Sequence, residues 1–167
     1  MITSGVQSGL TVGFAYSTAL TSRLIEYYEA GAGPSHATTL VKPGYVIDAR
    51  LSGGVALRPV SYLDRSLVHW YRIAAPEARV RDAIAFLTAQ EGQRYAWQDI
   101  LAFAVPGAFR KLTGAHHPWM CSYLAAAAQV GAGILPKPPV GLERITPLSL
   151  LLMDSAAGAV PLAGPQF

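Results

Sequence analysis

The 167 residues correspond to one domain, at roughly 150 residues per domain, and suffice to bury about two thirds of the unfolded surface. Hydrophobic residues make up 51% and charged residues 14% of the chain, which excludes disorder driven by high charge and low hydropathy. The formal net charge of +3 comes from basic residues that are scattered singly, and this pattern argues against nucleic acid as a partner.

The apolar stretches are too short to predict a membrane span. Asp99, Gln129 and Asp154 interrupt them before about 18 residues accumulate, so we expect no transmembrane helix. The first residues show no basic region followed by a long apolar one, so we expect no secretory signal and a cytoplasmic or assembly-associated location. The mean hydropathy of +0.30 suggests a surface partly covered in a homo-oligomer or larger assembly, although an Ala-rich composition gives the same value.

The first half of the chain predicts β-structure around a hairpin. Residues 10–16 are expected to form a strand, and residues 22–30 a helix that ends at Gly31. Two β-rich runs, 35–41 and 45–51, flank Pro43 and Gly44 and therefore predict a hairpin. Two further strands are expected at 53–60 and 68–74, where β-branched and aromatic residues are frequent.

The second half predicts helices. We expect helices at 76–91, with Pro76 as the first residue, at 97–105, and from about Cys121 to the glycines at 131 and 133. A short helix should begin at Pro147 with Thr146 as its cap, and residues 154–167 should form an arm outside the core. The order predicts an α+β fold in a single domain over 1–167, in which 1–34 supply an N-terminal strand and helix.

Cys121 is the first candidate for chemistry. As the single cysteine of the chain it excludes an intramolecular disulfide and structural zinc sites built on paired cysteines. Its predicted place in the first turn of a helix favours the thiolate, because the helix dipole stabilises negative charge there. The alternative interpretation is a small buried hydrophobic residue.

His36 and Asp48 form the second candidate, because they lie twelve positions apart across the predicted hairpin. An imidazole beside a carboxylate is the arrangement that orients a general base, whereas the alternatives are a structural histidine and a solvated strand charge. A strict two-residue turn would place Asp48 opposite Thr39, pointing away from His36. We therefore expect a three-residue connection at 42–44, or an equivalent bulge, which places Thr38 opposite Asp48 and a hydrogen bond between Asp48 and His36.

Several segments together resemble a known family. SHATTLV and YVIDA are similar to the His strand and third-residue strand of NlpC-like papain-fold cysteine hydrolases, and WMCSYLAAAAQVGAGILPKPP is similar to their nucleophile helix. RYAW resembles the Tyr-containing segment that precedes that helix. Because His36 and Asp48 come before Cys121, the chain resembles the circularly permuted branch, and GGVALRP resembles that branch as well. The expected fold is papain-like, with an antiparallel sheet or barrel layer packed on helices.

This resemblance implies a role for each matching residue. Cys121 would attack an acyl carbon, His36 would take its proton and return it to the leaving group, and Asp48 would hold the imidazole. The oxyanion would meet the backbone N–H of Cys121 and the Tyr95 hydroxyl. Two further residues, Trp119 and Ser122, are expected on the oxyanion or substrate side of the site.

The resemblance implies cleavage of an amide bond, and the substrate it favours is a cell-wall peptide. Two alternatives remain open: an amidase or acyltransferase acting on a lipid or acyl amide, and an accessory component of an assembly such as a phage tail with an idle site. His116 and His117 are candidates to border the cleft or to serve as the base. Arg50 and Arg58 are candidates to meet a substrate carboxylate, although exposed strand charges explain them equally well. No metal-ligand spacing is present among the histidines, so neither a metal nor another cofactor is expected.

Overall fold

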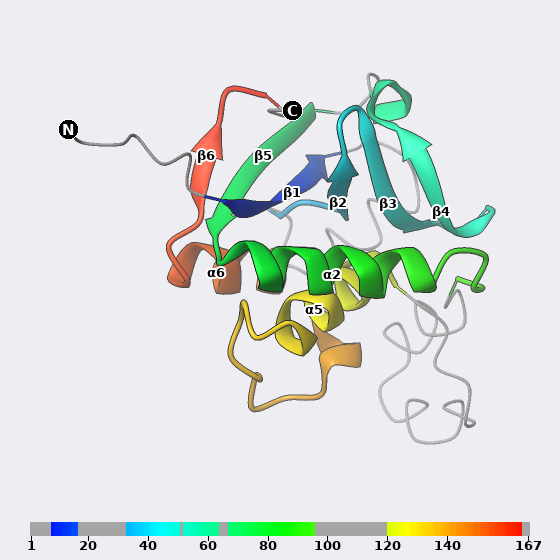
Figure 1. Cartoon of the computed structure of the whole chain (residues 1–167). Coiled ribbons are helices and arrows are strands. Elements are labelled where there is room, and N and C mark those ends of the chain that lie inside the picture. The colour runs from blue at the N-terminus through cyan, green and yellow to red at the C-terminus, as the bar shows by residue number, and fades with distance from the viewer. Residues whose placement is uncertain (1–7, 17–32, 51, 64–66, 96–119, 165–167) are drawn as a thin grey trace.

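The computed structural model describes residues 8–16, 33–50, 52–63, 67–95 and 120–164. Within them the protein is α+β, with a six-stranded antiparallel sheet in the order β4-β3-β2-β1-β5-β6 (Figure 1). The strands are β1 (Gly9–Tyr16), β2 (His36–Lys42), β3 (Tyr45–Arg50), β4 (Gly54–Pro59), β5 (Leu67–Ala74) and β6 (Val160–Leu162). The predicted α+β class is confirmed.

Three α-helices lie on one side of this sheet: α2 (Glu77–Ala89), α5 (Cys121–Gly131) and α6 (Pro147–Ala156) (Figure 1). Two short 3-10 helices, η1 (Val60–Leu63) and η2 (Leu142–Arg144), follow β4 and precede α6. Helix α5 packs against α2, β2 and β3, so its first residue is held near the start of β2. None of the helices in the described ranges is both long and apolar enough to cross a membrane.

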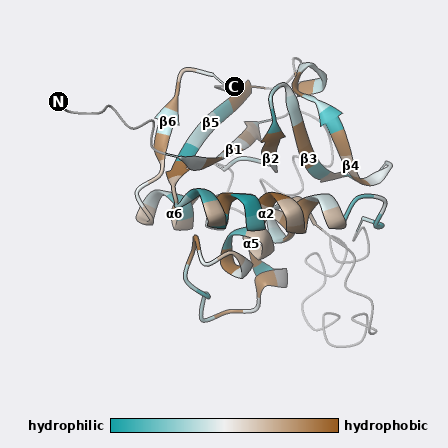
Figure 2. Cartoon of the chain, viewed as in Figure 1, coloured by the Kyte–Doolittle hydropathy of each residue, from teal (hydrophilic) through white to brown (hydrophobic). Residues whose placement is uncertain are grey.

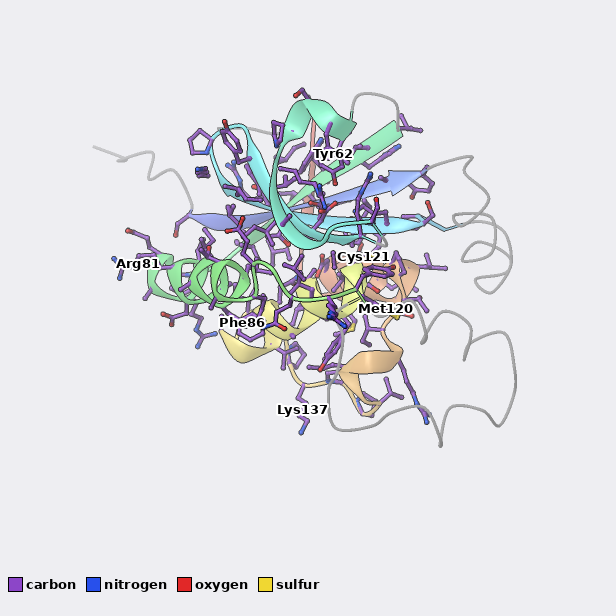
Figure 3. All side chains as sticks on the ribbon, turned by 90° about the vertical axis from the view of Figure 1, so that its right-hand side faces the viewer. Tyr62, Arg81, Phe86, Met120, Cys121 and Lys137 are labelled. Atoms are coloured by element: carbon purple, nitrogen blue, oxygen red, sulfur yellow. The ribbon has the colours of Figure 1, made fainter. Side chains whose placement is uncertain are left out.

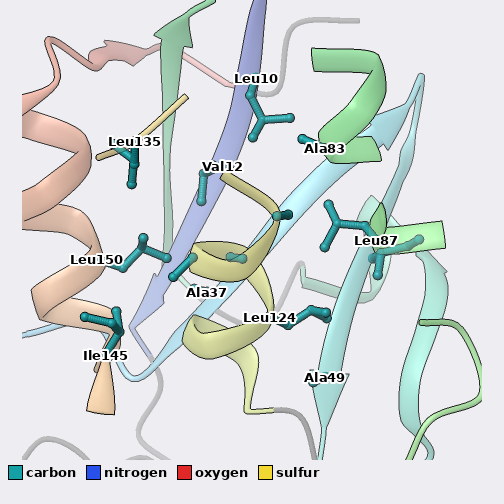
Figure 4. Packing of buried hydrophobic residues seen from close by; sticks show 14 of the residues in the cluster. Leu10, Val12, Ala37, Ala49, Ala83, Leu87, Leu124, Leu135, Ile145 and Leu150 are labelled. Atoms are coloured by element: carbon teal, nitrogen blue, oxygen red, sulfur yellow. The ribbon is translucent and has the colours of Figure 1, made fainter. Parts of the chain in front are cut away.

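The main core lies between the sheet and the helices. Figure 4 shows Leu124 of α5, Leu87 of α2 and Leu150 of α6 converging on the strands, and Figure 2 shows the apolar residues concentrated toward this layer. The strand residues of this core alternate along each strand, as a half-buried sheet requires, and include Leu10, Val12, Phe14, Ile47 and Ala49. Burial of this layer therefore fixes which side of each strand faces the helices.

A second, smaller apolar cluster covers the other face of the sheet. It contains Val46 of β3, Leu63 of η1 and Trp70 of β5. Trp70 lies directly over Gly13, where a Cβ atom would come within 2.7 Å of the indole ring. Because side chains alternate along β3, Asp48 and Arg50 share the face of Val46 and so lie on the η1 side of the sheet.

The register of the β2–β3 hairpin is set by a two-residue turn and a bulge. Lys42 pairs with Tyr45 around Pro43 and Gly44, the latter with a φ of 75°, a combination typical of a type II turn. Leu40 pairs with Val46, which leaves Val41 as an extra residue. Of the two expected forms, the three-residue connection is wrong and the equivalent bulge is present, at Val41 and so one residue before the expected range 42–44.

The predicted strands and the helices near 76–91, 121 and 147 are confirmed, and the Thr146 hydroxyl accepts a hydrogen bond from the Ser149 N–H at 3.1 Å. Pro76 is the N-cap of α2 and precedes its first residue. The predicted arm at 154–167 is wrong in part, because Asp154 is buried within α6 and β6 extends the sheet beside β5. The helices expected at 22–30 and 97–105 lie outside the described residues.

Candidate active site

Asp48 lies at the centre of a cluster of polar side chains. Its carboxylate is fully buried and contacts Nε2 of His36 at 2.8 Å and Nε of Arg58 at 3.0 Å. Nε of Arg50 lies 3.3 Å from the carboxylate, and the Tyr62 hydroxyl donates a hydrogen bond to it. Burial raises the pKa of Asp48, but His36, Tyr62 and Arg50 outweigh that effect and hold the pKa below its usual range.

The predicted hydrogen bond between His36 and Asp48 is therefore confirmed. Continuing the register of Thr39 with Ile47 by one residue places Thr38 opposite Asp48, so His36 reaches the carboxylate across one diagonal step. The Thr38 hydroxyl donates to the Ile47 carbonyl at 3.3 Å, which fastens the two strands beside the pair. His36 is the first residue of β2, and its side chain is only 14% exposed.

Cys121 is the first residue of α5 and is buried. Figure 3 shows it where the start of α5 faces the sheet, with Tyr62 on the η1 side. The Met120 N-cap makes no side-chain cap hydrogen bond, so the first N–H groups of the helix are not capped by that side chain. The backbone N–H groups of Ala37 and Ser122 instead bond to the Cys121 sulfur.

The electrostatics of the site favour a thiolate and imidazolium pair. Burial raises the pKa of Cys121, but the charge and hydrogen bond of His36, together with the two backbone N–H groups, bring it below its ordinary value. Burial lowers the pKa of His36, but the Cys121 charge and the Asp48 hydrogen bond more than compensate and raise it to about 9. These interactions therefore link the Cys121 thiol, the His36 imidazole and the Asp48 carboxylate.

Tyr95 reaches the same site from the segment that follows α2. Burial and the nearby charges of Cys121 and Asp48 raise the pKa of its phenol, so the hydroxyl stays protonated and is available as a donor. The segment is held by Gly54, whose φ is 60° and whose missing Cβ would come within 2.1 Å of the Gln93 carbonyl. That carbonyl accepts the Val55 N–H at 2.9 Å, which ties the segment to β4.

The expectation for the Ser122 side chain is corrected. Its hydroxyl is fully buried and donates to the Ile145 carbonyl at 2.6 Å, so it ties α5 to the end of η2 and does not face a substrate. Three other candidates, Trp119, His116 and His117, lie outside the described residues. His69 is not part of the cluster around Asp48, and its ring contacts Tyr16 edge to face.

Tyr62 is the site residue that the sequence did not indicate. It lies in a 3-10 helix directly after β4, and its hydroxyl meets Asp48 while its ring stacks under Arg50, with 4.4 Å between the guanidinium carbon and the ring centroid. The sequence signal available was an aromatic residue soon after a strand that also carries Arg58. An aromatic residue at such a position is as common in a packed core as in a functional site, so the sequence did not single out Tyr62.

The chain matches no protein-family model and no curated protein sequence. Among the described residues, no group of three or more His, Cys, Asp and Glu side chains has the arrangement of a metal site.

Proposed function

We propose that the chain is a cysteine-dependent hydrolase of amide bonds, papain-like in fold and circularly permuted, so that the base and its carboxylate precede the nucleophile in the chain. The observation that carries this proposal is the 2.8 Å contact of His36 with the buried Asp48 carboxylate, beside a Cys121 thiol whose pKa the charge and hydrogen bond of His36 lower. A sheet packed on a helix that begins with the cysteine also supports the papain-like arrangement. A buried cysteine of structural importance alone would need neither partner.

In the proposed reaction the Cys121 thiolate attacks the carbonyl carbon of an amide. The C–N bond breaks, and the His36 imidazolium gives its proton to the departing amine, leaving a thioester on Cys121. His36, now neutral, takes a proton from water, whose oxygen attacks the thioester and releases the acid and the thiolate. Asp48 holds the ring orientation and stabilises the imidazolium through its 2.8 Å hydrogen bond.

The negative oxygen of the tetrahedral intermediate needs donors that are already in place. The N–H of Cys121 belongs to the first turn of α5, where backbone N–H groups lack intrahelical acceptors. The neutral Tyr95 hydroxyl, close to the charges of both Cys121 and Asp48, is the second donor we propose. These two groups take the oxyanion role, and the Ser122 hydroxyl has no part in it.

The test compares turnover with thiol labelling. The wild-type chain is incubated with muropeptides, with acyl amides and with a thiol-reactive probe, and we expect turnover of the peptide class and labelling at Cys121. Cys121→Ala should lose both, because the reacting atom is gone. Ser155→Ala in α6, an exposed serine away from the site, is the matched control and should retain both.

Two results would contradict the proposal. Unchanged turnover in Cys121→Ala would show that the reaction does not need the Cys121 thiol. Labelling of Cys121 without turnover of either substrate class would instead favour the accessory role in an assembly, and turnover of acyl amides alone would move the substrate to the lipid class.

A further inference from the structure

Among the residues that the structure describes, the charges around Asp48 do not balance. One carboxylate faces two guanidinium groups, those of Arg50 and Arg58. The His36 and Cys121 pair adds nothing to the sum, because together they are neutral whichever of them holds the proton. Within this cluster of five side chains one positive charge is therefore left without a counter-ion.

The two arginines differ in their exposure and in how many of their nitrogens contact other described residues. Arg58 is 24% exposed, and it donates through Nε to Asp48 at 3.0 Å and through a terminal nitrogen to the Ser52 carbonyl at 3.5 Å. Arg50 is 39% exposed, and its Nε faces Asp48 at 3.3 Å. In the described part of the chain no hydrogen bond engages the two terminal nitrogens of Arg50, which form the fork that fits a carboxylate.

Arg50 is also held beside the reacting groups. The same Asp48 oxygen contacts Nε2 of His36 and Nε of Arg50, which places these two nitrogens within about 6 Å of one another. The guanidinium carbon lies over the Tyr62 ring, and this cation–π contact helps to hold the group in place. Tyr95 also lies near these groups, because the charges of Cys121, Asp48 and Arg50 all affect the pKa of its phenol.

We propose that Arg50 is a specificity residue that binds a carboxylate of the substrate close to the scissile amide. The inference rests on the proposed function and narrows its substrate to amides that carry an acid group, such as peptides with a nearby free carboxylate. Such a group supplies the negative charge that the described residues around Arg50 lack, and its oxygens accept hydrogen bonds from the two terminal nitrogens of Arg50. A neutral acyl amide does neither.

The test uses two alkylating reagents of similar size, iodoacetate and iodoacetamide. In both cases the Cys121 thiolate forms a C–S bond and iodide leaves, and only the charge of the reagent differs. The rate ratio of iodoacetate to iodoacetamide is measured for the wild type, Arg50→Gln, Arg50→Lys and Arg58→Gln, with free cysteine as the reference. Arg58→Gln is the matched control, because it removes an equal charge from the same carboxylate.

We expect the wild-type ratio to exceed that of free cysteine by roughly tenfold, as one unscreened charge nearby would cause. Arg50→Gln should bring the ratio back to that of free cysteine, Arg50→Lys should keep part of the excess, and Arg58→Gln should change it less than about threefold. A wild-type ratio equal to that of free cysteine, or equal losses in Arg50→Gln and Arg58→Gln, would overturn the inference.

The two reagents also separate this inference from the proposed function. Fast reaction with neutral iodoacetamide and no preference for iodoacetate would leave the nucleophile in place and remove the carboxylate site. Slow reaction with iodoacetamide at neutral pH would instead contradict the activated thiol, whatever the ratio.

Discussion

Nε2 of His36 lies 2.8 Å from Oδ2 of Asp48, although the hairpin register places Thr38, and not His36, opposite Asp48. The contact is diagonal, and it exists because the bulge at Val41 shifts the register by one residue. Without that extra residue the side chain of Asp48 would lie on the other face of β3, among the residues that pack on α5. One residue near the turn therefore decides whether the imidazole has a carboxylate partner.

Two substitutions of Asp48 should separate its role in orienting the His36 ring from the role of its negative charge. Asp48→Asn keeps an oxygen that can accept from His36, whereas Asp48→Ala removes the acceptor of the His36 ring and leaves the guanidinium groups of Arg50 and Arg58 without their carboxylate. We expect kcat/KM to fall in both variants, and by at least about tenfold more in Asp48→Ala. Steady-state hydrolysis measures this, and equal activity in the two variants would contradict the positioning role.

The pH dependence of alkylation should reflect the pair of charged groups. The lowered pKa of Cys121 means that the thiolate forms below the usual pH, and the raised pKa of His36, about 9, means that the imidazolium persists to that pH. The iodoacetamide rate should therefore reach its plateau well below pH 8.5, where an ordinary thiol is still titrating. Hydrolysis should decline above about pH 9, as the proton for the leaving amine is lost.

His36→Gln should return the midpoint of alkylation toward that of an ordinary thiol, because the imidazolium that stabilises the thiolate is gone. His69→Gln, which alters an exposed histidine of β5, is the control and should leave the midpoint unchanged. A midpoint that does not move in His36→Gln would rule out the pairing.

Tyr62→Phe removes the hydroxyl that donates to Asp48 and keeps the ring on which Arg50 stacks. We expect a loss of stability of about 1 kcal/mol and a fall in kcat with little change in KM, because a hydrogen bond to a buried carboxylate is lost. Tyr45→Phe is the control, since the Tyr45 ring is exposed and contacts Lys42. Urea unfolding and hydrolysis of both variants check the prediction, which fails if the two behave alike.

Gly54→Ala should displace the segment that carries Tyr95. The new Cβ would meet the Gln93 carbonyl at 2.1 Å in a backbone with a φ of 60°. Gly44→Ala has a similar positive φ, 75°, but no atom within 4 Å of the new Cβ, so it carries the backbone cost alone. We expect Gly54→Ala to be less stable than Gly44→Ala by about 1–3 kcal/mol, with a greater loss of activity, measured by urea unfolding and turnover.

Asp154 should make stability depend on pH. It is fully buried in α6, and burial raises its pKa to about 8, only partly opposed by Gln129. The folded state thus keeps a proton that the unfolded chain releases above about pH 4, so stability falls as the pH rises from about 4 to about 8. Asp154→Asn cannot ionise and should flatten this fall.

At pH 8 we expect Asp154→Asn to exceed the wild type in stability by on the order of 1–3 kcal/mol, since a carboxyl group that must ionise in the interior is replaced by one that stays neutral. Asp82→Asn, which removes an exposed carboxylate of α2, is the control and should leave the pH profile unchanged. Thermal unfolding from pH 5 to 8 measures both, and parallel profiles for Asp154→Asn and the wild type would contradict the assignment.

The sequence predicted the parts of the fold that depend on local patterns. Alternation and turn residues located the strands, and Pro147 with Thr146 located the start of α6. The requirement that His36 and Asp48 share a face also predicted a register shift near the turn. A bulge was one of the two expected forms, but the sequence did not decide between a bulge and a longer loop, because both have the same effect on register, and the bulge lies at Val41 and not at 42–44.

Long-range contacts were harder to predict. The pairing of β6 with β5 and the burial of Asp154 depend on how the last segment meets the sheet, and its small residues gave no periodic pattern. Tyr62 reaches Asp48 because η1 folds back over the outer face of β3, and Ser122 turns to Ile145 because η2 lies beside α5. The spacing of residues along the chain does not predict such contacts between elements.

The groups that lower the pKa of Cys121 come from β2 and from α5 itself, so the thiol takes its reactivity from a contact between the first and last thirds of the chain. A chain that is unfolded or only partly synthesised holds His36 without a docked α5, and its cysteine behaves as an ordinary thiol at neutral pH. Completed folding is therefore what lowers the pKa of Cys121. The extent of rapid thiol labelling at neutral pH therefore counts the natively folded molecules in a sample.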